Sequence, residues 1–355
     1  MKKKSLCAEE LSYFNAIACL MVIFVHVVSY GIACAPADSV RAALIYFPWC
    51  LALCVVPAFL FSSAAKMGRQ YQEDYSRREY VGYIAGRVKK IFLPYVGWNL
   101  IYYAVLVSVE YYALSAQDFL VKLFSGTMFS QFYYIVVAMQ FYLLKPVWFW
   151  IVKNVRWYVA VPAAVLVSYF SAYLNAFLKV WDTSFPYTDR IFTTYLVFWI
   201  VGLYAGRHWE QVTESVAGAG KSVAVGAGVV LLAAVIPYLQ HSRGIRLIDF
   251  AYHRVITDLL SIFILLWVCL KLRGAKVWLK RCLMFISEAS FSVYLSHCLF
   301  LATVEYLLED AGVSEIGVAL AIRALVCYTV PFALYVVMAR VRAVVGDGLA
   351  KIRKA

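Results

Sequence analysis

Two of the five histidines in this sequence lie deep inside long apolar segments. His26 belongs to the stretch "LSYFNAIACLMVIFVHVVSYG" at residues 11–31, and His297 belongs to "SEASFSVYLSHCLFL". An imidazole at the depth of the lipid chains must find a hydrogen-bonding partner or water, so it usually faces a helix-bundle interior or a cavity. It can then exchange protons, ligate a metal or only bond a neighbouring helix. Each residue taken alone leaves the functional and the structural interpretation open.

The helices that carry these histidines belong to a chain of apolar composition. Of 355 residues, 64% are hydrophobic and only 15% are charged, whereas a soluble domain has roughly 45–50% apolar and about 25% charged residues. Apolar runs recur along the whole length, and many reach the ~17–25 residues that cross a bilayer. We therefore predict an all-α, polytopic integral membrane protein with a single domain over residues 1–355, whose first apolar run is a retained helix rather than a signal peptide. We expect about ten transmembrane helices, at about residues 11–34, 43–65, 91–112, 131–152, 157–177, 190–206, 221–239, 256–272, 283–307 and 316–339.

The lysines and arginines are distributed unevenly between the two sides of this predicted bundle. If the N-terminus is cytoplasmic, most of the 33 basic residues fall in segments on the cytoplasmic side, as the positive-inside rule requires. This distribution predicts that both termini are cytoplasmic and that the chain crosses the cell (plasma) membrane many times. The net charge of +13 then faces anionic inner-leaflet lipid and does not indicate a nucleic-acid partner.

The two histidines occupy similar depths in this predicted topology. His26 lies in the first span and His297 in the ninth, and both spans run from inside to outside. At 1.5 Å per residue each histidine lies roughly 20–23 Å above the cytoplasmic end of its helix, so both can face one cavity. Two histidines without an intramembrane carboxylate are a poor ligand set, and the nine cysteines have no CxxC spacing. We therefore predict no metal site and no bound cofactor, and we interpret the cysteines as small packing residues.

Five segments, in this order and spacing, resemble the membrane-bound acyltransferase family 3, whose members O-acylate extracellular glycans. They are "YFNAIACLMVIFVHVVSYG" in the first span, "VPAFLFSSAAKMGRQ" in the second, "RVKKIFLPYVGWNLIYY" in the third, "QFYYIVVAMQFYLLKP" in the fourth and "SFSVYLSHCLFL" in the ninth. Through "QFYLLKP" the chain is also similar to the intercellular-adhesin polysaccharide O-succinyltransferases.

Two positions depart from the pattern of this family. The family has an arginine eleven residues before the first-span histidine, where this chain has Asn15. Eleven residues make three helical turns within about 20°, so Asn15 keeps a polar group on the face of His26 but without a cation. The fourth-span motif of the family opens with a histidine, where this chain has Gln131, which can form hydrogen bonds but cannot titrate.

The resemblance implies an acyl-CoA donor in the cytoplasm, acetyl-CoA or succinyl-CoA, and a hydroxyl acceptor on an extracytoplasmic polysaccharide or glycolipid. A desolvated imidazole stays neutral at pH 7 and is then in its base form. We expect His26 to be the general base or a transient acyl carrier, and His297 to orient the substrate or share the proton. Among the predicted binding residues, Arg87, Lys90 and Asn15 would contact the CoA donor, and Ser62, Ser63, Gln131, Tyr133 and Asp258 would contact substrate.

Two other functions remain open at the level of the sequence. A transporter or flippase for a glycan or a lipid-linked precursor would also have a polar cavity in a helical bundle, although the internal repeats of many transporters are not evident here. A non-catalytic relative that only binds a partner would be consistent with Asn15 and Gln131. The acyl group, the acceptor and the oligomeric state are not determined by the sequence.

Overall fold

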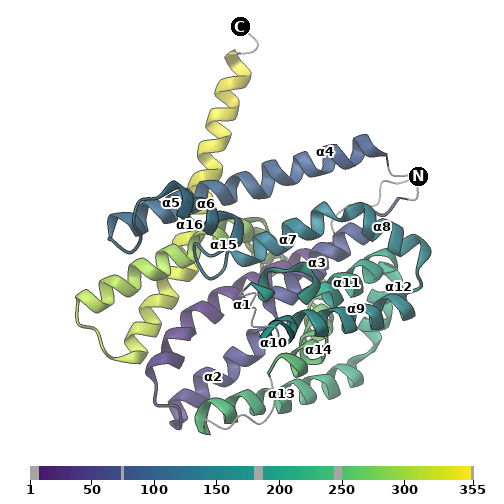
Figure 1. The fold of residues 1–355 in the computed structure, drawn as a ribbon, viewed down its shortest axis with the longest axis horizontal. Coiled ribbons are helices and arrows are strands. Elements are labelled where there is room, and N and C mark those ends of the chain that lie inside the picture. The colour runs from purple at the N-terminus through teal and green to yellow at the C-terminus, as the bar shows by residue number, and fades with distance from the viewer. Residues whose placement is uncertain (1–7, 73–75, 180–186, 244–249, 353–355) are drawn as a thin grey trace.

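The chain is built of helices, as predicted. The computed structural model describes residues 8–72, 76–179, 187–243 and 250–352, and no strand occurs within these ranges. Its helices, drawn in Figure 1, are α1 (Glu9–Cys34), α2 (Val40–Ala52), α3 (Val55–Arg69), α4 (Arg77–Arg87), the π-turn η1 (Val88–Phe92), α5 (Leu93–Ser108), α6 (Ala116–Ser125), α7 (Tyr133–Leu143), α8 (Lys145–Asn154), α9 (Trp157–Ala172), α10 (Leu174–Lys179), the 3₁₀ turns η2 (Thr188–Arg190) and η3 (Phe192–Tyr195), α11 (Leu196–Arg207), α12 (Trp209–Gly218), α13 (Gly220–Arg243), α14 (Phe250–Lys271), the 3₁₀ turn η4 (Leu272–Gly274), α15 (Val277–Asp310) and α16 (Ile316–Ile352).

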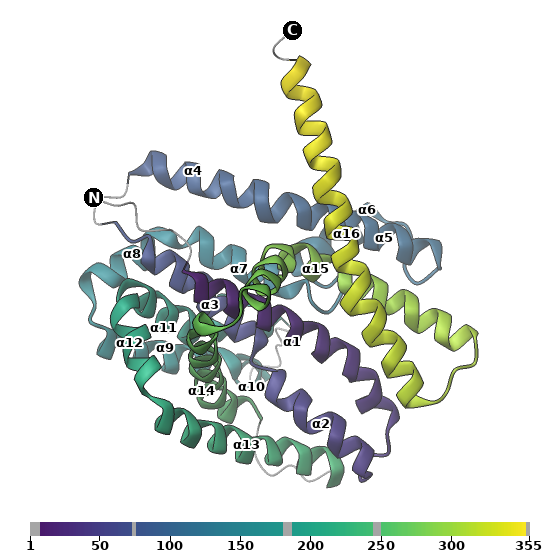
Figure 2. The same ribbon diagram turned by 180° about the vertical axis from the view of Figure 1, so that it is seen from behind.

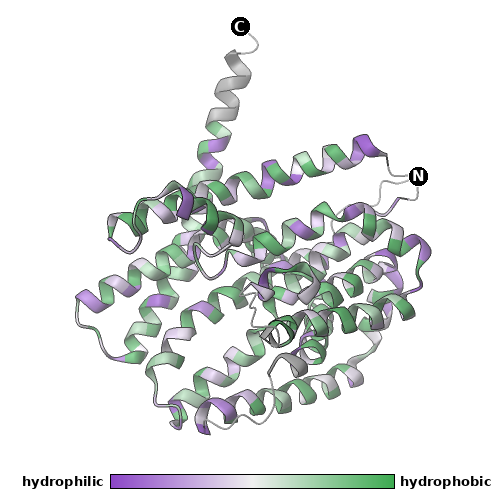
Figure 3. Cartoon of the chain, in the orientation of Figure 1, coloured by the Kyte–Doolittle hydropathy of each residue, from purple (hydrophilic) through white to green (hydrophobic). Residues whose placement is uncertain are grey.

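The described helices are those of a multi-pass membrane protein. Seven helical segments are long and apolar enough to cross a bilayer, or eight if α7 and α8, which are bent by 58°, form one broken span. Hydrophobic residues, coloured green, recur along the helical ribbons in Figure 3. Helix α9 has only 16 residues and α11 only 12, so each is shorter than the ~17–25 residues of a full span. The predicted count of ten and the cytoplasmic position of both termini therefore stay predictions, and the lysines at positions 2–4 lie outside the described residues.

Helices α1 and α15 cross the bundle and bring the two apolar histidine segments together. Helix α15 packs against both α1 and α16, so the first and the last long helices of the chain share one neighbour. Figure 2 shows α1, α15 and α16 side by side, with α2 and α13 on the other side of α1. The two helices that carry the histidines thus pack directly against each other.

Helices α3 and α11 pack unusually closely because glycines line their contact. Gly202 and Gly206 have the Gly-x-x-x-Gly spacing that lets two membrane helices approach each other. A Cβ added to Gly202 would lie 2.5 Å from the backbone oxygen of Phe61, and one added to Gly206 would overlap the backbone oxygen of Ala65. The backbones of the two helices are therefore in direct contact, without side chains between them.

A buried carboxylate ties three segments at the end of the bundle where α1 begins. Glu10 accepts a hydrogen bond from Trp209 Nε1 at 2.6 Å, and Arg273 donates to both of its oxygens, at 2.8 and 3.2 Å. These bonds connect α1 to α12 and to η4. Glu10 is only 3% exposed, so these donors, and not water, stabilise its negative charge.

We expect Trp209→Phe to lower the free energy of unfolding by about 1.5–3 kcal/mol, since it removes a hydrogen bond to a buried charge. The measurement is chemical or thermal unfolding of the purified protein in detergent. Trp278→Phe is the matched control, because Trp278 is 63% exposed on α15. Equal stability of the two variants would contradict this role of Glu10.

Candidate active site

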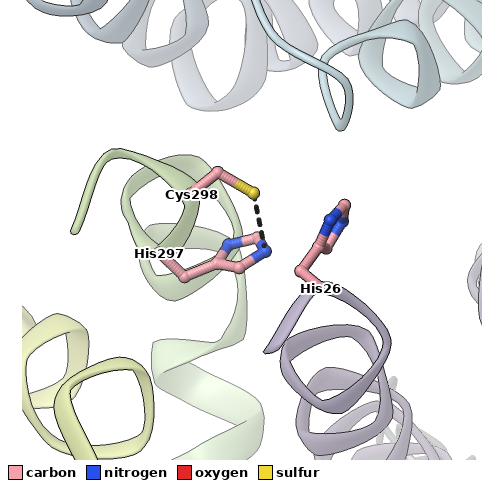
Figure 4. Close-up of side chains that lie close together, drawn as sticks. All are labelled: His26, His297 and Cys298. Atoms are coloured by element: carbon pink, nitrogen blue, oxygen red, sulfur yellow. Dashed lines mark hydrogen bonds between the residues drawn. The ribbon is translucent and has the colours of Figure 1, made fainter. Parts of the chain in front are cut away.

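The imidazoles of His26 and His297 face each other across the contact between α1 and α15. Their ring centroids lie 5.2 Å apart with an interplanar angle of 57°. Figure 4 shows both side chains pointing into the same space from the two helices. His297 is completely buried, whereas His26 is half-buried. The structure thus brings together two residues that are 271 positions apart in sequence. Of the two, only His26 lines the cavity described below, and the catalytic roles of both stay predictions.

The hydrogen bonds of His297 determine which of its nitrogens is free to act as a base. Nδ1 lies 3.0 Å from the carbonyl oxygen of Val293 and 2.9 Å from that of Tyr294. Carbonyl oxygens only accept hydrogen bonds, so Nδ1 carries the proton and donates it. In the neutral ring Nε2 is then the acceptor, and it lies 3.2 Å from the thiol of Cys298. The backbone of α15 therefore orients this imidazole with its basic nitrogen away from the helix.

A cavity of about 410 Å³, here called the His26 cavity, lies beside the histidine pair. Its wall includes four of the predicted site residues, His26, Gln131, Tyr133 and Asp258. Much of the remaining wall is apolar, with valines from α1, α3 and α9. The chamber is thus an apolar space with a small number of polar groups, as small-molecule sites usually are.

A second cavity of about 290 Å³, here called the Lys90 cavity, is lined by three further predicted residues, Asn15, Ser63 and Lys90. Lys90 belongs to η1, a π-turn within the long α4–α5 helix, and π-turns frequently occur at functional sites. Asn15 and His26 lie three turns apart on α1, so one helix contributes to both cavities. Ser62 is buried and donates a hydrogen bond to Asn15 Oδ1 at 2.7 Å, which makes it a support for Asn15 and not part of the wall.

Arg87 lies next to the Lys90 cavity and stacks on aromatic rings. Its guanidinium carbon is 4.6 Å from the ring centroid of Tyr142, a residue of the cavity wall, and 4.8 Å from that of Tyr83. Lys145 Nζ lies 4.0 Å from the same Tyr83 ring. Two cations are therefore held beside the cavity by one tyrosine, an arrangement that favours anions in their vicinity.

Tyr294 lines both cavities and was not among the predicted site residues. It lies three residues before His297 on α15, and their ring centroids are 6.2 Å apart. Its hydroxyl donates a hydrogen bond to the backbone oxygen of Gln131. The i, i+3 spacing from His297, which places two residues on one helical face, was the sequence signal that could have identified it.

Gln131 occupies the position where the family pattern has a histidine, and neighbouring helices hold it in place. Its Nε2 donates to the hydroxyl of Tyr102 at 3.0 Å, and Tyr102 donates to the backbone oxygen of Leu295 at 3.2 Å. Within the described part of the chain, Gln131 Oε1 is buried and has no hydrogen-bond partner. Gln131 as a residue also lines the His26 cavity.

Arg254 of α14 is a second residue that the sequence did not single out. Pro57 has no N–H, so the carbonyl of Leu53, four residues earlier, lacks its helical hydrogen bond at the break between α2 and α3. Arg254 Nη2 donates to this carbonyl at 3.0 Å and lies 3.8 Å from Asp258 Oδ2. Arg254 and Asp258 both line the His26 cavity and give it a paired charge.

The thiol of Cys298 joins the two histidines in one cluster. One ligand atom from each of these three residues lies within 4.8 Å of the others. The prediction of no metal site rested on the lack of a carboxylate beside the histidines and of CxxC spacing among the cysteines. It did not include a thiol next to the pair, and a thiolate would add a soft ligand that zinc accepts. The absence of a metal stays a prediction.

The sequence of this chain is similar to that of known membrane acyltransferases. The family model of the acyltransferase domain, acyltransferase family 3, matches residues 9–338. A protein of Bacillus subtilis (strain 168), named "Putative membrane-bound acyltransferase YfiQ", is 24% identical over 312 residues, which cover 82% of this chain and 81% of that protein. No solved structure matches the chain.

Proposed function

The chain belongs to acyltransferase family 3, and on this basis we propose that it moves an acetyl or succinyl group from cytoplasmic acyl-CoA to a hydroxyl of a cell-surface glycan. Family and helices together identify a multi-pass membrane acyltransferase. The donor, the O-acyl linkage, the glycan acceptor and the plasma membrane are the proposed part. The observation that carries the proposal is the facing pair of imidazoles beside Tyr294, the residue that lines both cavities.

In this proposal the Lys90 cavity receives the acyl donor. Lys90 and Arg87 supply positive charge for the CoA phosphates, and Asn15 and Ser63 supply hydrogen bonds along the cavity wall. The missing arginine of the family at position 15 is compensated by these nearby cations. The acyl end of the donor then points toward Tyr294 and the histidines.

The His26 cavity receives the acceptor hydroxyl. A hydroxyl becomes an effective nucleophile only as its proton is removed, and His26 is the base that lines this cavity. Gln131, Tyr133 and the Arg254–Asp258 pair offer hydrogen bonds that orient the acceptor. His297, beside His26, shares the proton or orients the acyl carbonyl.

Acyl transfer is tested with the purified protein in lipid nanodiscs and radiolabelled acetyl-CoA or succinyl-CoA. The readout is the amount of label that is released from CoA or moved to extracted surface glycans. In cells, the matching measurement is the amount of ester-linked acyl groups on surface polysaccharide and glycolipid with and without the protein. Binding of CoA without transfer would indicate a non-catalytic relative. Glycan movement across the membrane with no change in esters would indicate the transporter.

We expect Lys90→Ala to raise the KM for acyl-CoA by about 5–10-fold with little change in kcat, because one charge-assisted phosphate contact contributes roughly 1–1.5 kcal/mol of binding. The measurement is the dependence of the transfer rate on acyl-CoA concentration. Lys89→Ala is the control, since Lys89 is a neighbouring exposed lysine in the same π-turn and is not part of the wall. Equal KM values for both variants would remove Lys90 from the donor site.

A further inference from the structure

Cys298 and His297 have the geometry of a nucleophile and its base. The thiol lies 3.2 Å from His297 Nε2, the nitrogen that the backbone bonds of Nδ1 leave as an acceptor. Cys298 must therefore be the donor of this S–H···N hydrogen bond. A nucleophile bonded to a base that a third group orients is the arrangement that activates serine and cysteine enzymes. Here the carbonyls of Val293 and Tyr294 are the orienting group.

The thiol also lies within reach of the base on the acceptor side. Sγ of Cys298 and one ring nitrogen of each histidine are within 4.8 Å of one another, and Figure 4 shows the thiol and both rings grouped between α1 and α15. Cys298 is completely buried, so no bulk water competes with a second substrate at this position. A covalent acyl group on Sγ would be adjacent to His26, the residue that lines the acceptor cavity.

We propose that Cys298 carries the acyl group as a thioester between the donor and the acceptor, so that transfer proceeds in two steps. This inference rests on the proposed function and specifies its mechanism. His297 is then the base of the first step and His26 the base of the second. The division of labour accounts for the presence of two imidazoles in one site.

In the first step Sγ attacks the carbonyl carbon of acyl-CoA while its proton moves to His297 Nε2. The bond between the carbonyl carbon and the CoA sulfur breaks, and the CoA thiolate leaves with the proton from His297. One thioester replaces another, so the exchange needs no oxidant, reductant or further reactant. Because the proton moves as the bond forms, no isolated thiolate has to exist in the apolar interior.

In the second step the acceptor hydroxyl gives its proton to His26 and attacks the thioester carbonyl carbon. The bond to Sγ breaks, and an oxygen ester is formed on the acceptor. As this bond breaks, the sulfur of Cys298 takes up the proton, which passes from His26 by way of His297, whose ring centroid lies 5.2 Å from that of His26. Both histidines are then neutral and the thiol is restored.

Tyr294 controls access to the thiol in this proposal. It precedes Cys298 by one helical turn on the same face of α15 and lines both cavities. Its hydroxyl is held by the backbone oxygen of Gln131. Release of this single bond and rotation of the ring would open a path from either cavity toward the histidines and Cys298.

The test traps the acyl-enzyme. Purified full-length protein is incubated with radiolabelled acetyl-CoA, and in parallel succinyl-CoA, without acceptor, then denatured and digested. We expect label on the peptide that contains Cys298 and release of that label by neutral hydroxylamine, which cleaves thioesters and leaves oxygen esters intact. Cys298→Ala is expected to abolish the label and to lower transfer to acceptor by at least about 100-fold.

Matched variants separate this role from packing. Cys282→Ala changes an exposed cysteine on the same helix, and Cys269→Ala changes a buried cysteine on α14; both are expected to keep the label and the rate. Cys298→Ser keeps the size and the hydrogen bond but is a much weaker nucleophile, so its thermal unfolding should match the wild type while transfer falls.

Four results would overturn the proposal. They are transfer by wild-type protein without label on Cys298, label on His26 in its place, full activity of Cys298→Ala, and zinc bound in a 1:1 ratio that Cys298→Ala removes. In the first three cases acyl transfer itself still stands. If wild-type protein neither hydrolyses nor transfers either acyl group, both the proposed function and this mechanism fail.

Discussion

Replacement of His26 by alanine is expected to lower the rate of acyl transfer by about 10²–10⁴-fold, because a positioned general base contributes that factor. The position of His26 supports this magnitude: its ring lines the larger cavity and faces His297 at a centroid distance of 5.2 Å. A substrate hydroxyl in that cavity has no other imidazole on the wall within the described residues. The measurement is the initial rate of label transfer from acyl-CoA under saturating donor.

The control for this loss is a histidine outside the site. His208→Ala changes an exposed residue between α11 and α12 and should leave the rate within experimental error of the wild type. His26→Gln keeps a hydrogen-bonding group of similar size but cannot accept the proton, so it should be about as slow as His26→Ala while unfolding at the same temperature as the wild type. A His26→Gln enzyme with near-normal rate would reduce His26 to a residue that positions the acceptor.

Gly206→Leu is expected to be the most damaging substitution for stability, with a loss of about 3 kcal/mol or more and a low yield of folded protein. A Cβ at this position already overlaps the backbone oxygen of Ala65 in α3, and backbone atoms cannot rotate away as side chains do. The helices would have to separate, which would also disturb the contact of Gly202 with Phe61. Overpacking of a tight core by one or two methylenes typically costs about 1–3 kcal/mol, and leucine adds more.

The measurement for this prediction is thermal unfolding and size-exclusion behaviour in detergent. Gly228→Leu is the matched control, because Gly228 lies in the interior of α13 and a Cβ there would meet nothing within 4 Å. Gly206→Ala should fall between the two, with a loss of about 1–3 kcal/mol. A normal yield and melting temperature for Gly206→Leu would show that α3 and α11 can move apart without loss of the fold.

Local pattern in the sequence was sufficient for the class of the protein, and it named several residues that the structure places around two cavities. Apolar runs of helical length without charges are typical of helices that lie in lipid, where the helix satisfies its own backbone hydrogen bonds. The membrane fold therefore followed from composition. The rise of 1.5 Å per residue placed His26 and His297 at one depth, and the structure brings them together. The motifs around Asn15, Ser63 and Lys90 identified residues that line one cavity.

The local breaks within the predicted spans came only from the structure, because length and hydropathy do not register where a helix is broken. The predicted span at 43–65 lies within one candidate span, residues 40–69, but this span is locally interrupted between α2 and α3, just before Pro57. The predicted span at 190–206 begins with two 3₁₀ turns, so that α11 has only 12 residues. Such breaks are stable only because other helices satisfy the freed backbone groups, as Arg254 does for Leu53.

The sequence by itself thus determined that helices cross a membrane and that Asn15 and His26 share one face of the first helix, because both depend on the pattern along a single helix. Only the tertiary structure decided that Tyr294 lines two cavities and that the thiol of Cys298 meets the basic nitrogen of His297. Neighbouring residues on a helix point about 100° apart. The contact between the adjacent residues His297 and Cys298 depends on the His297 ring, which bonds two carbonyl oxygens of α15 and is completely buried. This burial results from the packing of the whole bundle and not from the sequence of one helix.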